Sequence, residues 1–198
     1  MPALIVYIIG PSGVGKDSLQ HWLLRHWTGP GCLHIAQRTI TRPTTGMEGH
    51  EAVTQDAFAA ARQAGAFALD WAANGFDYGI RHQAFAQAAA DDVLLVNGSR
   101  AYVLQALARL PELAIVSLTA SHDTLHQRLR ERGRETEADI AARTARSFHI
   151  ELPSGVRVLH LSNEGCLAET GQTVLSCLRQ WRTHTPAQAP APAQAPLM

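Results

Sequence analysis

The chain has little charge, few cysteines and no long apolar run, and each of these excludes a class of protein. Charged residues make up 17% of the 198 residues and the formal net charge is zero, so a broad electrostatic surface for nucleic acid or acidic membranes is not indicated. Three scattered cysteines (Cys32, Cys166 and Cys177) fit neither a disulfide framework nor a zinc site. No apolar run approaches the roughly 20 residues that span a bilayer. We therefore expect a cytoplasmic protein without a nucleic-acid or membrane partner.

The basic residues that are present are nearly all arginines. Lysine and arginine together number 17, of which only Lys16 is a lysine, and six arginines lie between residues 128 and 146. Guanidinium groups match the oxygens of phosphate groups in a bidentate manner, which makes this bias informative. Hydrophobic residues make up 46% of the chain, which suits a globular domain with a sizeable core.

Apolar segments alternate with helical patterns along most of the chain. The continuous apolar run over 3–9 is typical of a strand buried on both faces of a parallel sheet. The same reasoning predicts strands over 33–36, 93–97, 113–119 and 156–161, and helices over 17–27, 55–64, 82–90, 99–109, 137–149 and 167–182, with another helix capped by Ser121 or Asp123 and ending at 132. This alternation predicts an α/β fold with a parallel sheet.

One region interrupts the alternation, and the chain ends in a tail of different composition. Residues 38–90 form an expected insert: 38–51 is polar and predicts a loop, while 67–71 and 76–80 predict a hairpin around Asn74-Gly75. Residues 184–198 are rich in proline and alanine and predict a disordered tail. We therefore expect a single domain over 1–183 that carries the insert beside its sheet.

A phosphate-binding motif follows the first predicted strand. The sequence Gly10-Pro11-Ser12-Gly13-Val14-Gly15-Lys16-Asp17 fits G-x-x-x-x-G-K between a strand and a helix. Its glycines let backbone N–H groups converge on phosphate, and its lysine reaches the β- and γ-phosphates. The alternative is a glycine-rich turn without a ligand, which the unique lysine at the motif position disfavours. The segment 10–18 is therefore interpreted as an ATP site.

The motif departs from its usual form at one position. Where a serine or threonine normally binds Mg²⁺, this chain has Asp17, followed by Ser18. A carboxylate oxygen suits a hard cation, and Ser18 would need a shift of one residue. We therefore expect Asp17 to be the metal ligand.

The arginine-rich window supplies candidates for the reaction itself. Transfer of a phosphoryl group requires positive charge around the moving group, and a closing lid supplies that charge while excluding water. We assign the lid to about 130–138 and expect Arg128, Arg132 and Arg143 to act in catalysis. An exposed helix with Arg–Glu pairs is the alternative.

Several separated blocks of the sequence resemble guanylate kinase and its relatives in the P-loop kinase superfamily. They are the motif 10–18, the stretch 39–43, the stretch 67–79 and the arginine window. The resemblance implies a nucleoside-monophosphate-kinase-like fold in which Arg42 and Tyr78 hold the acceptor phosphate. The positions that read guanine in that family are altered here, to Asp70, Ile80 and Asn97.

These variants are similar to the ribose 1,5-bisphosphate phosphokinase family of phosphonate catabolism. The blocks that carry this resemblance are Gly10–Ser18, Gln37–Pro43, His50–Ala52, Tyr78–Ile80 and Val96–Arg100. It implies that ATP phosphorylates ribose 1,5-bisphosphate to 5-phosphoribosyl 1-diphosphate (PRPP). Arg38, Arg42 and Arg100 are then candidates for the second phosphate, and Glu51, Asp70 and Asn97 for the ribose hydroxyls.

Three points remain open on the sequence alone. Asn163 follows the last predicted strand and is a candidate for contact with adenine. A guanylate kinase with altered base contacts and a non-catalytic interaction module are competing functions, although such modules typically lose the phosphate-binding residues kept here. A homodimer is also left open.

Overall fold

The central element of the protein is a five-stranded parallel sheet. The computed structural model describes residues 3–42, 49–133, 136–137, 140 and 150–183. The sheet has the order β2-β7-β1-β8-β9, and every neighbouring pair in it is parallel. Its strands are β1 (Leu4–Ile9), β2 (Leu33–Ile35), β7 (Val93–Asn97), β8 (Ala114–Thr119) and β9 (Val158–Ser162). The α/β class with a parallel sheet is confirmed.

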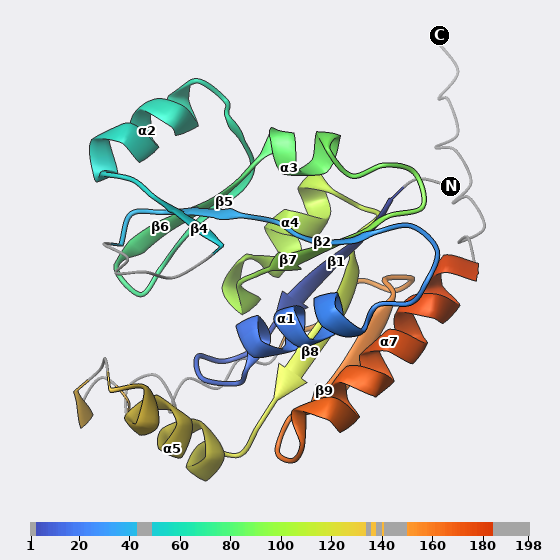
Figure 1. The fold of residues 1–198 in the computed structure, drawn as a ribbon. Coiled ribbons are helices and arrows are strands. Elements are labelled where there is room, and N and C mark those ends of the chain that lie inside the picture. Colours follow the sequence, from blue (N-terminus) through green and yellow to red (C-terminus); the bar gives the residue numbers. More distant parts are fainter. Residues whose placement is uncertain (1–2, 43–48, 134–135, 138–139, 141–149, 184–198) are drawn as a thin grey trace, which may run out of the picture.

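Helices cover both faces of this sheet, which explains why its strands are apolar throughout. On one face, Val6 and Ile8 of β1 belong to a core with Leu19 of α1 (Lys16–His26) and Val174 of α7 (Leu167–Thr183). The alternate strand residues contribute to a second core against η1 (Arg100–Tyr102) and α4 (Val103–Arg109). Figure 1 shows α1 and α7 on one side of the sheet and α4 on the other. Burial on both faces therefore selects the continuous apolar runs.

The predicted insert forms a small second sheet beside the first. Its order is β4-β3-β6-β5, from β3 (Arg38–Ile40), β4 (His50–Ala52), β5 (Phe67–Ala73) and β6 (Phe76–Arg81). The predicted hairpin is present, and positive φ angles of 53° at Asn74 and 79° at Gly75 form its turn. Two further helices, α2 (Gln55–Gln63) and α3 (His82–Ala86), belong to this region (Figure 1).

The prediction of a loop over 38–51 is wrong at both ends, where the strands β3 and β4 lie. Arg38 pairs with His50 in a parallel register, and Arg38 pairs with Ile80 on the other side. The polar composition of these strands concealed them, because β3 finds a backbone partner in β6, more than 35 residues away in sequence, and β4 in turn pairs with β3. This pairing brings the side chains of β3 and β4 toward the end of the central sheet.

Other boundaries differ in detail. The helix predicted over 82–90 ends at Ala86, and the one over 99–109 is divided into η1 and α4. The helix α5 (His122–Arg132) is capped by Ser121, whose hydroxyl accepts from the N–H of Thr124 at 3.2 Å. The tail and most of the helix predicted over 137–149 lie outside the described residues.

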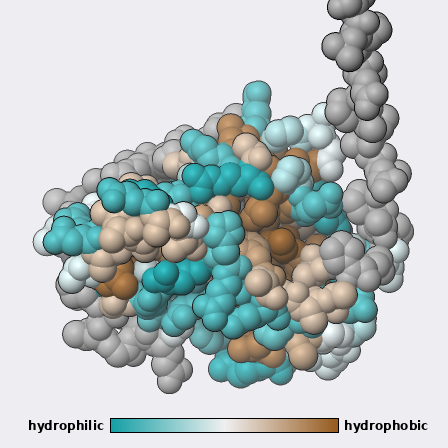
Figure 2. Space-filling view, turned by 90° about the horizontal axis from the view of Figure 1, so that it is seen from above, coloured by the Kyte–Doolittle hydropathy of each residue, from teal (hydrophilic) through white to brown (hydrophobic). Residues whose placement is uncertain are grey.

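The surface carries no broad apolar face on the side that Figure 2 shows, where hydrophobic residues lie in separate patches among hydrophilic ones. In the described part of the chain, no helix is long and apolar enough to cross a membrane.

Candidate active site

A cavity of about 440 Å³ opens where β1 and β7 end and the second sheet begins. Because the carboxyl ends of parallel strands are the usual ligand site of open α/β sheets, this is the expected place for chemistry. The lining combines residues of the predicted ATP site with residues of the insert: Gly10, Ser12, Gly13, Gly15, Lys16, Asp17, Ser18, Arg38, Ile40, Arg42, His50, Trp71, Ala72, Ala73, Asn74, Tyr78, Asn97, Gly98, Ser99, Arg100, Ala101 and Arg132.

The loop between β1 and α1 curves tightly around the start of the helix. Gly15 caps α1 in the left-handed region, with a φ of 95°, and as a glycine it has no side chain to bond the first amides of the helix. A Cβ atom at Gly15 would lie 2.8 Å from Nδ2 of Asn163, and one at Gly10 would lie 2.7 Å from the carbonyl oxygen of Leu118. Only glycine fits at these two positions. The open helix N-terminus is a site that favours an anion.

The ammonium group of Lys16 folds back over this loop. Its Nζ donates to the carbonyl oxygens of Gly10 at 2.9 Å and Pro11 at 3.1 Å. Burial, together with repulsion from the neighbouring arginines, lowers the pKa of Lys16 to about 7 against the attraction of Asp17. A bound polyphosphate would supply the opposing charge that this group lacks.

Asp17 meets a cation and an amide across the cavity. Its Oδ1 accepts from Arg38 Nη2 at 2.9 Å and from Asn97 Nδ2 at 2.6 Å. Burial opposes ionisation, but Arg38, Lys16 and the amide of Asn97 outweigh it, so the pKa of Asp17 lies below its ordinary value. Asn97 is only 2% exposed, and its Oδ1 has no hydrogen-bond partner among the described residues. The site thus presents a charged carboxylate and an unsatisfied amide oxygen side by side.

Positive charge dominates the cavity wall. Besides Lys16, the arginines Arg38, Arg42, Arg100 and Arg132 line it, while Asp17 is the one acidic residue among its described lining residues. Such an excess in a concave site attracts polyanions, and more than one phosphate group is needed to balance it.

Aromatic side chains form the wall of the insert. Trp71 stacks on Tyr78 at a centroid distance of 5.6 Å and on Tyr102 at 5.7 Å. Trp71 and Tyr78 line the cavity, and Trp71 is also 7% exposed within the core. The stack holds the Tyr78 side chain at the cavity by packing.

Comparisons with known proteins agree with this geometry. No family model matches the chain. A curated ribose 1,5-bisphosphate phosphokinase PhnN from Burkholderia pseudomallei is 42% identical over 174 residues, covering 88% of this chain and 94% of the relative. The one from Pseudomonas fluorescens is 43% identical over 183 residues, covering 90% and 96%. The chain belongs to the ribose 1,5-bisphosphate phosphokinase family.

The structural neighbours of this phosphokinase-family chain define its fold class. A guanylate kinase from Anaplasma phagocytophilum superposes with a TM-score of 0.66, covering 93% of this chain and 88% of the other, at 14% sequence identity. The guanylate-kinase-like P-loop fold expected from the motifs is therefore confirmed. At this identity the likeness concerns the fold alone.

Several residues predicted for the site are placed elsewhere by the fold. Glu51 accepts from Arg81 at 2.8 and 2.9 Å and from Thr39 at 2.6 Å. Asp70 accepts from Arg62 at 2.9 Å and Arg109 at 2.7 Å. Neither lines the cavity, because arginines on the strands and helices around the second sheet bind both carboxylates.

Asn163 and Arg128 also lie outside the cavity lining. Asn163 is 3% exposed; its Nδ2 donates to the carbonyl oxygen of Val14 at 2.7 Å, and its Oδ1 accepts from Thr170 at 2.9 Å. It therefore supports the phosphate loop from behind. Arg128 is half-buried on α5, and Arg143 lies outside the described residues. Their catalytic assignments remain predictions.

Among the lining residues that the sequence did not identify as site residues, His50 and Ser99 make polar contacts there. His50 Nε2 lies 3.1 Å from Arg38 Nη2, a neighbour created by the pairing of β3 with β4. The N–H of Ser99 donates to the hydroxyl of buried Tyr7 at 3.0 Å. That bond fixes the loop that carries Arg100, and only the register of β1 with β7 reveals it.

Proposed function

We propose that the chain transfers the terminal phosphoryl group of ATP to the 1-phosphate of ribose 1,5-bisphosphate, forming PRPP and ADP, in the cytoplasm and within phosphonate catabolism. One observation carries the proposal. The phosphate-binding loop and four arginines from three separate regions of the chain face one cavity that contains a single carboxylate among its described residues. A nucleoside triphosphate together with a sugar bisphosphate matches that charge.

The loop over 10–18 forms the part of the cavity that would bind the nucleotide. Its amides and the N-terminus of α1 would bind the β- and γ-phosphates, and Lys16 would bridge them. Asn163 contributes by holding Val14 in place. Arg132 lies at the end of α5 and lines the same cavity, so it can add positive charge opposite the loop.

The residues present fit a Mg²⁺ ion. Asp17 offers a carboxylate oxygen, and the buried Oδ1 of Asn97 offers an amide oxygen that has no hydrogen-bond partner in the described part of the chain. Oxygen ligands are what Mg²⁺ prefers, and Ser18 lies one residue further along the same wall. When bound, the ion would neutralise charge on the β- and γ-phosphates.

The insert and the loop after β7 form the part of the cavity that would bind the sugar bisphosphate. Arg42 and Tyr78 are the proposed ligands of the phosphate that reacts, and Arg38 and Arg100 those of the second phosphate. Ile80, at a position where guanylate kinases have a serine, is fully buried in the core, and Asp70 is engaged by two arginines. A guanine base would find no polar partner from either residue, which favours the sugar acceptor.

The transfer needs no general base, because the nucleophile is an oxygen of an already ionised phosphate. That oxygen bonds to the γ-phosphorus, the bond from phosphorus to the bridging oxygen breaks, and the electron pair stays on the β-phosphate of ADP. Lys16 and the arginines would stabilise the charge on the transferring group, which is where most catalysis of phosphoryl transfer arises.

The test offers the purified protein ATP and Mg²⁺ with either ribose 1,5-bisphosphate or GMP, and PRPP and GDP are quantified. We expect PRPP to form and GDP to be absent. Arg42→Met should lower PRPP formation by about 10²-fold or more, whereas Arg25→Met, an exposed arginine of α1, should not. Turnover of GMP alone would contradict the proposal, and so would binding of ATP without turnover of either acceptor.

A further inference from the structure

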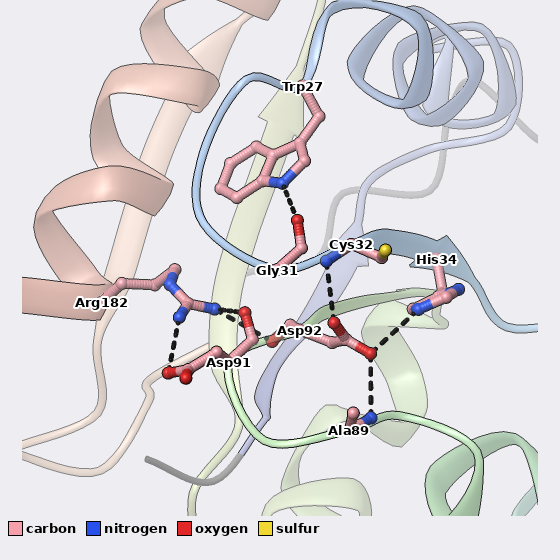
Figure 3. A network of polar contacts seen from close by, with 8 residues as sticks. All are labelled: Trp27, Gly31, Cys32, His34, Ala89, Asp91, Asp92 and Arg182. Atoms are coloured by element: carbon pink, nitrogen blue, oxygen red, sulfur yellow. Dashed lines mark hydrogen bonds and ion pairs between the residues drawn. The ribbon is translucent and has the colours of Figure 1, made fainter.

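A second cluster of reactive side chains lies at the opposite end of the central sheet, where the strands begin (Figure 3). Cys32 directly precedes β2, His34 lies within β2, and Asp92 directly precedes β7. One ligand atom from each, a sulfur, a ring nitrogen and a carboxylate oxygen, lies within 4.8 Å of the other two. We propose that Cys32, His34 and Asp92 bind a divalent transition-metal ion of the zinc class.

The backbone brings these three side chains together without help from any loop tip. Residues two apart on a strand point to the same side, which places Cys32 and His34 alongside each other. The neighbouring parallel strand aligns Val93 with Leu33, and the N–H of Val93 donates to the carbonyl oxygen of Cys32 at 2.8 Å. Asp92 therefore lies beside Cys32 at a fixed register, immediately before two paired strands whose rigidity suits a metal site.

The carboxylate is oriented before any ion arrives. Its Oδ1 accepts from the N–H of Cys32 at 2.7 Å, and its Oδ2 accepts from the N–H of Ala89 at 2.8 Å and lies 3.0 Å from His34 Nε2. Asp92 is 6% exposed, so this carboxylate is buried, whereas Cys32 and His34 beside it are exposed. The bonds from two backbone amides resemble the outer contacts that orient ligands in metal sites. An ion would take the place of the contact between His34 Nε2 and Asp92 Oδ2, and the neutral imidazole would then carry its proton on Nδ1.

Nearby groups hold the turn and balance its charge. Arg182 of α7 pairs with the Asp91 carboxylate at 3.0 Å and donates to the backbone carbonyl oxygen of Asp91 (Figure 3). Gly31, in the turn before β2, packs closely against that carbonyl oxygen: its φ is 71°, and an added Cβ would lie 2.0 Å from the oxygen. Because Asp91 neutralises Arg182, the guanidinium does not cancel the charge that Asp92 offers to a cation.

The donor set determines the kind of ion. Sulfur and imidazole nitrogen favour zinc and cobalt over magnesium and calcium, which prefer oxygen alone. Three protein ligands leave a fourth tetrahedral position, and the exposure of Cys32 and His34 lets water occupy it. Binding would release the thiol proton of Cys32 to solvent as the metal–sulfur bond forms. The scattered cysteines concealed this site in the sequence, because its other two ligands are not cysteines.

The test uses the reduced, nucleotide-free full chain, titrated with CoCl₂. We expect one equivalent of Co²⁺ to produce a near-ultraviolet thiolate-to-cobalt band that Zn²⁺ removes and that a large excess of Mg²⁺ leaves in place. Cys32→Ser and His34→Gln should lose the band. The matched variants Cys166→Ser and His160→Gln, which change exposed residues elsewhere, should keep it.

Two further measurements keep the result interpretable. Thermal melts without metal would show that the Cys32 and His34 variants fold; Asp92 stays unchanged, because its bonds to Cys32 and Ala89 support the fold. Zn²⁺ at a hundredfold excess over its Kd should then raise the Tm of the wild type by about 5 °C and not that of the two variants. No band in the wild type, or a band that survives either variant, would overturn the proposal. Its outcome is independent of the kinase assay.

Discussion

Asn97→Asp tests the contact between Asp17 and Asn97. In the wild type Asn97 Nδ2 donates to Asp17 Oδ1 at 2.6 Å. The substitution replaces that donor by a second carboxylate, which cannot donate unless it is protonated. Two carboxylate charges with centres about 4 Å apart repel by about 4 kcal/mol at an effective dielectric constant of about 20.

The measured loss should be smaller, because solvent and salt screen the pair. The Asp17 side chain is 40% exposed, so we expect a loss of about 2 kcal/mol in the free energy of unfolding at pH 8. For a domain of this size that loss lowers Tm by about 4–8 °C. Thermal melts followed by circular dichroism between pH 5 and 8 measure it without substrate or metal.

The pH dependence should reverse in the variant. In the wild type the lowered pKa of Asp17 contributes stability above the ordinary carboxyl pKa, and this contribution is lost in acid. In Asn97→Asp the two carboxyl groups share a proton, so the folded state binds more protons than the unfolded chain. The loss of stability of this variant relative to the wild type should therefore be largest at pH 8 and shrink toward pH 5.

The exchange Asp17→Asn with Asn97→Asp restores one donor and one charge at the same contact. It should recover most of the stability that the single Asn97→Asp variant loses. Asn74→Asp, which adds a charge at an exposed turn of the same cavity, is the matched control and should change Tm little. Stability equal to the wild type at pH 8 in the single variant, or additive losses in the double variant, would refute the reasoning.

Three other substitutions have defined outcomes. Lys16→Met should lower the rate of phosphoryl transfer by about 10³-fold or more and leave Tm unchanged. Because the pKa of Lys16 in the nucleotide-free protein is about 7, binding of ATP to the wild type should take up close to one proton at pH 8 and almost none at pH 6. Calorimetry in buffers of different ionisation enthalpy measures this uptake. Tyr7→Phe removes the hydroxyl that accepts a hydrogen bond from the Ser99 N–H, and it should reduce the free energy of unfolding by about 1–2 kcal/mol in urea titrations. The KM for the sugar substrate should rise, and an unchanged KM would argue that Tyr7 does not position the loop that carries Arg100. Asn163→Ala removes the support of Val14 and should weaken ATP binding by about tenfold, whereas Ser176→Ala, which removes a side-chain hydrogen bond within α7, should not; equal effects would indicate general destabilisation.

Much of the fold could be read from local patterns. The apolar run of β1 and the glycines that follow it are contiguous, so their periodicity and spacing were sufficient to predict a strand, a loop and a helix in that order. The strands β3 and β4 escaped prediction because β3 pairs with the distant β6 and β4 pairs with β3, and no local pattern states which distant segment supplies a partner.

The sequence by itself determined the phosphate loop, because backbone shape at Gly10 and Gly15 and the position of Lys16 depend on neighbouring residues alone. Only the tertiary structure decided which polar residues face the cavity. Asn97 meets Asp17 across 80 positions of the chain, whereas Glu51 and Asp70 are engaged by arginines outside the cavity. The physical reason is that a carboxylate pairs with whichever cation the packing of strands and helices brings nearest, and that packing is settled by burial of the whole core.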